Sequence, residues 1–280
     1  MLKRVATTLM MTAKEACWAA QPDVLKRAYW ARIRDIEFAA LLRSTKLGYI
    51  QLERSSFGDL NKENAQKLVS AFTRFTALVG LILGGSEHRS IIEAFELFKQ
   101  LMVTLSECET LRILTITNNP CTIGINSIRT VLQEGRLQHL NLTNNNMSPK
   151  DTKKLADYIG RCTALVTLGL GRNEIQDAAE NVAAALQRCT NIKKLELTKC
   201  SIGNHTMTKA AGYLAELSSL TELNLSDNPI GDEAVASLVK SCSTLVILDL
   251  SSTWLSILPR DTCRMTNLKV LNLDNNKRLV

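Results

Sequence analysis

The sequence contains few residue combinations that could support catalysis or metal binding. Its three histidines, His88, His139 and His205, share no spacing, and none stands at a metal-ligand interval from a cysteine or an aspartate. The glycine-rich stretch ILGGSEH lacks the Lys-Ser/Thr pair of a phosphate-binding loop. No Gly-x-Ser-x-Gly or His-Glu-x-x-His pattern occurs. We therefore expect a protein that is not an enzyme and that needs neither a metal ion nor a cofactor.

Eight cysteines raise the question of disulfide bonds or a zinc site. Six of them, however, fall at recurring positions of the repeat described below, where other copies carry apolar residues or Asn: Cys108, Cys121, Cys162, Cys189, Cys200 and Cys242. We expect these six to pack in the core as small apolar side chains. Only Cys17 and Cys263 lie outside this scheme, and so many unpaired thiols favour a reducing compartment.

An internal repeat accounts for those positions. The unit reads Leu-x-x-Leu-x-Leu-x-x-Asn, and all three apolar positions of every copy are Leu or Ile. Copies start at Leu47, Leu78, Leu111, Leu137, Leu165, Ile192, Leu220, Leu245 and Leu268. The Asn position is occupied by Asn119, Asn145, Asn173, Asn228 and Asn276, and in the other copies by Ser55, Ser86, Cys200 and Thr253.

Each part of the unit predicts a local structure. Alternation of apolar and polar residues indicates a half-buried strand, and the Asn side chain suits the tight turn that follows it. The stretch GDEAVASLVKSC then has helical spacing, with Ala234, Leu238 and Cys242 on one face and two acids in the first turn. One unit cannot bury its apolar face alone, but stacked units share a continuous core.

This unit resembles the leucine-rich repeat, and spacings of 26 to 28 residues in the middle of the chain resemble the ribonuclease-inhibitor-like class. The resemblance implies an α/β solenoid over residues 47–280. It would be a horseshoe of about nine repeats with a parallel sheet on the concave side and helices on the convex side. The copy from Leu245 contains no clear helix and resembles a shorter class of repeat.

Residues 1–46 form a separate basic segment, with nine Lys or Arg against four Asp or Glu. The first twenty residues contain no acid before Glu15 and resemble a mitochondrial targeting sequence, although an ordinary amphipathic helix would also fit. Residues 22–46 have helical spacing and are expected to form a helical N-terminal cap. Their basic and aromatic side chains would allow contact with RNA through Lys26, Arg27, Trp30, Arg32, Arg34 and Arg43.

The strand residues between the leucines should face the concave side. Five of those positions are acidic and one is Lys, so this surface suits a basic protein segment, although a merely solvated face is the alternative. The residues expected to bind a protein there are Tyr49, His139, Lys194, Glu196, Glu222, Asp249 and Asp274. No amphipathic segment follows the ninth strand, so a partner is also expected to dock on its exposed leucines, Leu271, Leu273 and Leu279.

These features favour a scaffold or adaptor, acting as a subunit or assembly factor of a larger complex. The basic segment favours a mitochondrial ribonucleoprotein such as the ribosome, and no apolar run is long enough to span a membrane. A respiratory or ATP-synthase assembly component would also fit within mitochondria. An enzyme inhibitor, a GTPase activator using Arg172, and a cytoplasmic or cytoskeletal subunit such as an axonemal protein are compatible with the same pattern.

Overall fold

A computed structural model describes residues 27–30, 48–53, 62–85, 95–119 and 124–279. Within these ranges the chain alternates between strands and helices, and it forms a single ten-stranded parallel sheet in the order β1 to β10. The strands are β1 (Arg27–Trp30), β2 (Tyr49–Glu53), β3 (Gly80–Gly84), β4 (Ile113–Thr117), β5 (His139–Asn141), β6 (Thr167–Gly169), β7 (Lys194–Glu196), β8 (Glu222–Asn224), β9 (Ile247–Asp249) and β10 (Val270–Asn272).

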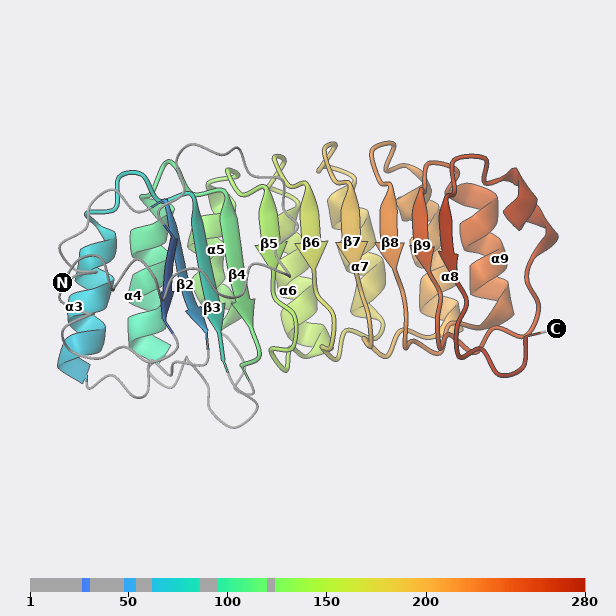
Figure 1. Ribbon diagram of the computed structural model, residues 1–280, viewed down its shortest axis with the longest axis horizontal. Helices are drawn as coiled ribbons and strands as arrows, with labels where there is room; N and C mark the ends of the chain where they lie inside the picture. The colour runs from blue at the N-terminus through green and yellow to red at the C-terminus, as the bar shows by residue number, and fades with distance from the viewer. Residues whose placement is uncertain (1–26, 31–47, 54–61, 86–94, 120–123, 280) are drawn as a thin grey trace, which may run out of the picture.

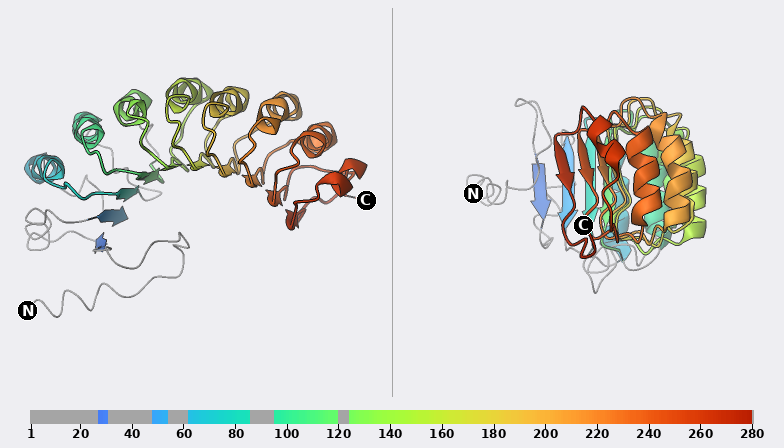
Figure 2. Two further views of the ribbon diagram at one scale, coloured as in Figure 1. Left: turned by 90° about the horizontal axis from the view of Figure 1, so that it is seen from above. Right: turned by 90° about the vertical axis from the view of Figure 1, so that its right-hand side faces the viewer.

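One helix separates each pair of neighbouring strands from β2 to β9. The helices are α3 (Lys62–Phe72), α4 (Phe95–Ser106), α5 (Ile125–Gln133), α6 (Pro149–Ile159), α7 (Ala178–Leu186), α8 (Asn204–Ala215) and α9 (Gly231–Ser241). Only a short 3₁₀ helix, η3 (Arg260–Arg264), lies between β9 and β10, as the weak helical pattern after Leu245 predicts. Figures 1 and 2 show the consequence: an arc with the sheet on its inner side and the helices on its outer side.

The core lies between the sheet and the helices. The central apolar residues of eight successive strands are at most 1% exposed, which makes them one continuous stack: Ile50, Leu81, Leu114, Leu140, Leu168, Leu195, Leu223 and Leu248. The same face of each helix closes the stack, as in α9, where Ala234, Val235 and Leu238 are buried. Since each unit packs only on its neighbours, burial of this stack holds the arc together.

The predicted helical cap is wrong over Arg27–Trp30, which form the strand β1 paired in parallel with β2. The cause is the free edge of β2, whose unpaired N–H and C=O groups accept another strand, and Tyr29 and Trp30 are residue types that favour strands. Leu25, Ala28 and Trp30 also have the spacing of the repeat's apolar positions, and the register places Ala28 beside Ile50. Residues 27–30 therefore add a tenth strand to the sheet, next to β2. The rest of residues 1–46 lies outside the described ranges.

Candidate protein-binding surface

The repeat asparagines fix the loops that leave the carboxyl ends of the strands. Asn228 is 1% exposed. Its Nδ2 donates to the carbonyl oxygens of Leu197 and Leu225 at 2.7 and 2.9 Å, and its Oδ1 accepts from the backbone N–H groups of Cys200 and Ile202 at 2.9 and 3.1 Å. One side chain thus joins its own unit to the preceding one. Asn145, Asn173 and Asn276 bond in the same way, which gives the concave face a constant loop geometry.

The loops also repeat in backbone conformation. The residue before the Asn position has a φ between 53° and 59° in seven copies, at Asn118, Asn144, Arg172, Lys199, Asp227, Ser252 and Asn275. Such a left-handed conformation suits Asn and Asp and strains most other residues. Arg172, the residue considered for GTPase activation, therefore occupies a regular turn position, and its side chain is exposed.

The expected core positions of the cysteines are confirmed where the structure describes them. Cys162, Cys189, Cys200 and Cys242 are buried, Cys108 is half-buried, and Cys263 is exposed. Burial raises the pKa of Cys162 to about 11 and that of Cys189, Cys200 and Cys242 to about 12. Cys17 and Cys121 lie outside the described residues.

One column of concave residues has a structural role that the sequence did not reveal. Asn141, Asn224, Asp249 and Asn272 each accept a hydrogen bond from the backbone N–H two residues later, at 2.9 to 3.0 Å. Asp249 also accepts from the Ser251 hydroxyl at 2.7 Å. These side chains hold the ends of their own strands. Asp249, which was expected to bind a partner, therefore already uses one carboxylate oxygen to stabilise its own loop.

Among the side chains that the structure describes, the remaining charged residues of the concave face are one ion pair and two single acids. The Nζ of Lys194 lies 3.4 Å from a carboxylate oxygen of Glu222 on the next strand, and both side chains are about two-fifths exposed. Glu196 follows on β7, and Asp274 is exposed two residues beyond β10. Since Lys194 largely compensates Glu222, the net negative charge of this half comes from Glu196, Asp249 and Asp274.

Two exposed aliphatic residues lie among these acids. Ile247 on β9 and Val270 on β10 stand directly beside each other in the sheet and are 36% and 50% exposed. Glu222 is the neighbour of Ile247 on the other side. The alternation of strand residues placed both aliphatics on the concave face, but only their adjacency makes them an apolar patch. We call Glu196, Glu222, Ile247, Asp249, Val270 and Asp274 the acidic concave patch.

The part of the concave face from β2 to β6 has fewer charged side chains among the residues that the structure describes. A Cβ built on Gly80 would lie 2.6 Å from the ring of Tyr49, so the tyrosine ring covers that glycine on the neighbouring strand. His139 Nδ1 lies 2.9 Å from the hydroxyl of Thr167, and burial lowers the pKa of the histidine. Tyr49 on β2 and His139 on β5 thus reach the concave surface but lie outside the acidic concave patch, which begins at β7.

The leucines of β10 and the loop after it are half-buried against the core: Leu271, Leu273 and Leu279. No strand pairs with the outer edge of β10 within the described residues. The expected docking of a partner on these leucines stays a prediction. Among the proposed RNA contacts, Arg27 and Trp30 belong to β1, and Lys26, Arg32, Arg34 and Arg43 lie outside the described residues.

Two of the three histidines lie in the described part of the chain, and they belong to different elements. His139 lies on β5 and His205 on α8, and His88 is outside the described ranges. No group of three or more His, Cys, Asp or Glu residues is arranged to hold a metal ion among the residues described. None of the described helices is long and apolar enough to cross a membrane. What the site offers is therefore a shaped and charged surface.

The repeated strand, Asn turn and helix define this chain as a leucine-rich-repeat solenoid similar to the ribonuclease-inhibitor-like class. A model of the leucine-rich repeat matches residues 216–239, the unit that contains β8 and α9. A ribonuclease inhibitor of Sus scrofa is 31% identical over 149 residues, which is 50% of this chain and 32% of the inhibitor. The chain thus spans about a third of that relative's length.

Among solved structures, an internalin of Listeria monocytogenes is 17% identical, with 83% of this chain and 69% of the internalin covered and a TM-score of 0.48. Internalin C2 of the same organism is 19% identical, with 72% of this chain and 74% of the internalin covered and a TM-score of 0.49.

Proposed function

We propose that this chain is a non-enzymatic protein-interaction scaffold that holds a basic segment of a partner on the acidic concave patch. The observation that carries this proposal is the exposed Ile247–Val270 pair beside Glu222 and Asp249. Protein interfaces combine an apolar centre with a polar rim, and complementary charge selects the partner and speeds its association. The patch offers both features on one rigid sheet.

The partner's apolar side chain would rest on Ile247 and Val270, and its Lys or Arg residues would meet Glu196 and Asp274. Glu196 and Asp274 are better test positions than Glu222 and Asp249. Reversing Glu222 would also break the ion pair with Lys194, and reversing Asp249 would break hydrogen bonds within its loop.

The test is affinity purification of the tagged full chain from its own cells, followed by quantitative mass spectrometry. The double variant Glu196→Lys, Asp274→Lys and the single variant Val270→Ser should each lose the stoichiometric partners, with a loss of about tenfold or more. The control is Asp157→Lys, which reverses an exposed charge on the convex helix α6. Retention of all partners by the concave variants would reject this surface.

A second candidate is an inhibitor of a basic enzyme, which the similarity to the ribonuclease inhibitor of Sus scrofa favours. The enzyme would be held by the same acidic concave patch. The test is hydrolysis of RNA by a pancreatic-type ribonuclease with increasing amounts of the full chain. Stoichiometric inhibition that Glu196→Lys weakens would support this candidate, and an unchanged rate at micromolar chain would reject it.

The setting in a mitochondrial ribonucleoprotein rests on the basic composition of residues 1–46. Within this proposal the chain is a ribosomal subunit or assembly factor. Ribosomal or RNA-processing proteins that co-purify and then leave on ribonuclease treatment would support it. Partners from one membrane complex that resist ribonuclease would favour a respiratory or ATP-synthase assembly component instead. Sequencing the N-terminus of the purified chain would show whether the first twenty residues are removed, and fluorescence microscopy would locate the chain.

A further inference from the structure

A second exposed apolar surface lies on the loops after β9 and β10 and not on the concave strands. Trp254 is 74% exposed, the most exposed large apolar side chain of the described residues, and Ile257 follows at 63%. Both come after the Asn position of the unit that starts at Leu245. The core aromatics Phe72 and Phe75 are buried, whereas the unit that contains Trp254 leaves its indole in water. Such exposure of a large apolar side chain is unfavourable and often marks a binding site.

The backbone conformation of Trp254 is also unusual for a tryptophan. Its φ is 64°, in the left-handed region. Of the four equivalent residues that the structure describes in earlier units, Asn146 and Ser201 have φ values of 53° and 56°, and the other two do not have a positive φ. Asn adopts this conformation readily, whereas a bulky side chain is strained in it. Since Asn146 and Ser201 hold the same conformation without an indole, the fold gives no reason for a tryptophan at this position.

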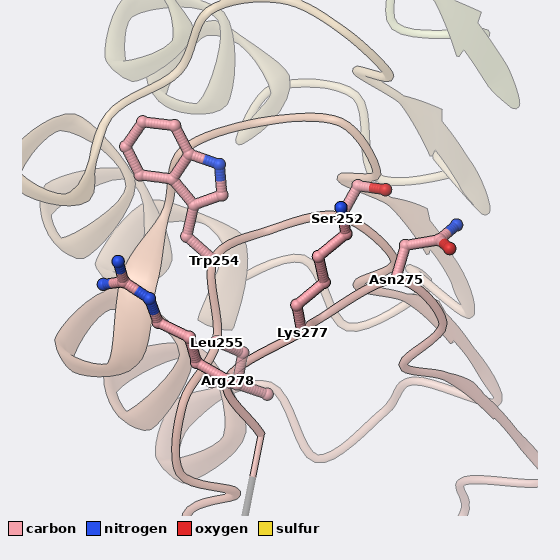
Figure 3. A pocket seen from close by; sticks show the side chains of 6 residues that line it. All are labelled: Ser252, Trp254, Leu255, Asn275, Lys277 and Arg278. Atoms are coloured by element: carbon pink, nitrogen blue, oxygen red, sulfur yellow. The ribbon is translucent and has the colours of Figure 1, made fainter.

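Trp254 borders a hollow of about 440 Å³ between the two loops. Its lining consists of Ser252, Trp254, Leu255, Asn275, Lys277 and Arg278. Figure 3 shows Trp254 and Arg278 extending to one side of the loops and Lys277 extending on the other side, toward Ser252. The buried Leu255 supplies the apolar floor, and two cations and two small polar residues form the wall. A hollow of this size accommodates one or two large side chains.

The charge of this end is opposite to that of the acidic concave patch. Residues 254–279 contain five Lys or Arg against two Asp or Glu, and the two cations that line the hollow, Lys277 and Arg278, form none of the ion pairs found among the described residues. Trp and Arg are among the residue types that most often contribute a large share of the binding energy in protein interfaces. An acidic segment could form ion pairs with these two cations, whereas the acidic concave patch would repel it.

We propose that this hollow binds an acidic protein segment, with one apolar or aromatic side chain placed against Trp254 and the neighbouring carboxylates on Lys277 and Arg278. A protein is favoured over single-stranded RNA because Ile257 and Leu258 continue the exposed surface with aliphatic side chains. Successive bases would need further aromatic platforms, and none lines the hollow. None of the residues that line the hollow belongs to the acidic concave patch, so variants of the lining test this proposal on its own.

The experiment uses the full chain and a fluorescein-labelled twelve-residue peptide of Asp and Glu around a central Leu-Phe pair, with fluorescence anisotropy as the readout. Matched probes are the same peptide with Ser-Ser at the centre, a Lys-rich peptide with the Leu-Phe pair, and a labelled oligouridine. The chain variants are Trp254→Asn and Arg278→Glu. Lys150→Glu is the control, because it reverses an exposed charge on the convex helix α6.

We expect the acidic Leu-Phe peptide to bind at least tenfold more tightly than the other three probes, and both hollow variants to lose about tenfold in affinity while Lys150→Glu keeps it. Trp254→Asn should melt at the same temperature as the wild type or higher, since Asn suits the left-handed turn. Equal binding of the Ser-Ser peptide, tighter binding of oligouridine, or a lower melting temperature for Trp254→Asn would each overturn the proposal.

Discussion

Replacing Asn228 by Ala should strongly destabilise the solenoid, because this one side chain makes five hydrogen bonds across two units. Its Nδ2 donates to the carbonyls of Leu197, Leu225 and Ser226 at 2.7, 2.9 and 3.1 Å, and its Oδ1 accepts from the N–H groups of Cys200 and Ile202 at 2.9 and 3.1 Å. Alanine replaces none of these bonds, and water does not reach the site, since Asn228 is 1% exposed.

The magnitude follows from the groups that lose their partner. Each buried backbone group left unpaired costs about 1–3 kcal/mol, and relaxation of the loop recovers part of the sum. Two N–H groups lose their acceptor outright, and at least one carbonyl loses its donor. We therefore expect Asn228→Ala to lower the free energy of unfolding by about 3–5 kcal/mol.

Urea unfolding followed by far-ultraviolet circular dichroism measures this change. The matched control is Asn191→Ala, at an exposed loop position before β7, which should change the free energy by less than about 0.5 kcal/mol. A repeat array can unfold in segments, so fluorescence and circular dichroism transitions should be compared. A loss below about 1 kcal/mol for Asn228→Ala would refute the role assigned to the repeat asparagines.

Three further predictions concern other positions. Thr253→Asn should raise the melting temperature in differential scanning calorimetry. The hydroxyl of Thr253 donates to one backbone carbonyl, that of Leu250, whereas an Asn side chain at this position can also bond to the preceding unit. A lower melting temperature would contradict this prediction. Asp232→Asn should destabilise at pH 7. The hydroxyl and N–H of Ser256 lower the pKa of Asp232, so the carboxylate stabilises the fold above the ordinary Asp pKa of about 4, and this stabilisation is lost as the pH falls through the lowered pKa. The difference in the free energy of unfolding between the two proteins should therefore narrow as the pH falls below about 4, and a constant difference would refute the ionic explanation. Iodoacetamide at about pH 8 should label the exposed Cys263 in the native chain. The buried Cys200, whose pKa is about 12, should stay unlabelled until urea is added. If peptide mapping finds both cysteines labelled in the native chain, the assigned burial is contradicted.

The sequence by itself determined the fold of residues 47–280, because every unit repeats the same local rules. Leu or Ile at three fixed positions predicted the buried stack, and Asn at the turn predicted the bonded loops. The cysteines could be assigned to the core for the same reason: Cys162 and Cys189 occupy positions that other units fill with apolar residues. These interactions lie within a unit or between adjacent units, so a linear pattern is sufficient to describe them.

Tertiary structure decided what depends on neighbours in space. Residues 27–30 satisfy both a helical and a strand pattern, and pairing with the free edge of β2 makes them a strand. The Lys194–Glu222 pair and the adjacency of Ile247 and Val270 arise from the register of separate strands. The left-handed backbone of Trp254 occurs at the same position in two earlier units, and the exposure of its side chain is seen only in the folded chain. Residue order alone does not specify distances between side chains on different strands, so the two surfaces proposed to bind partners could be outlined only in the folded arc.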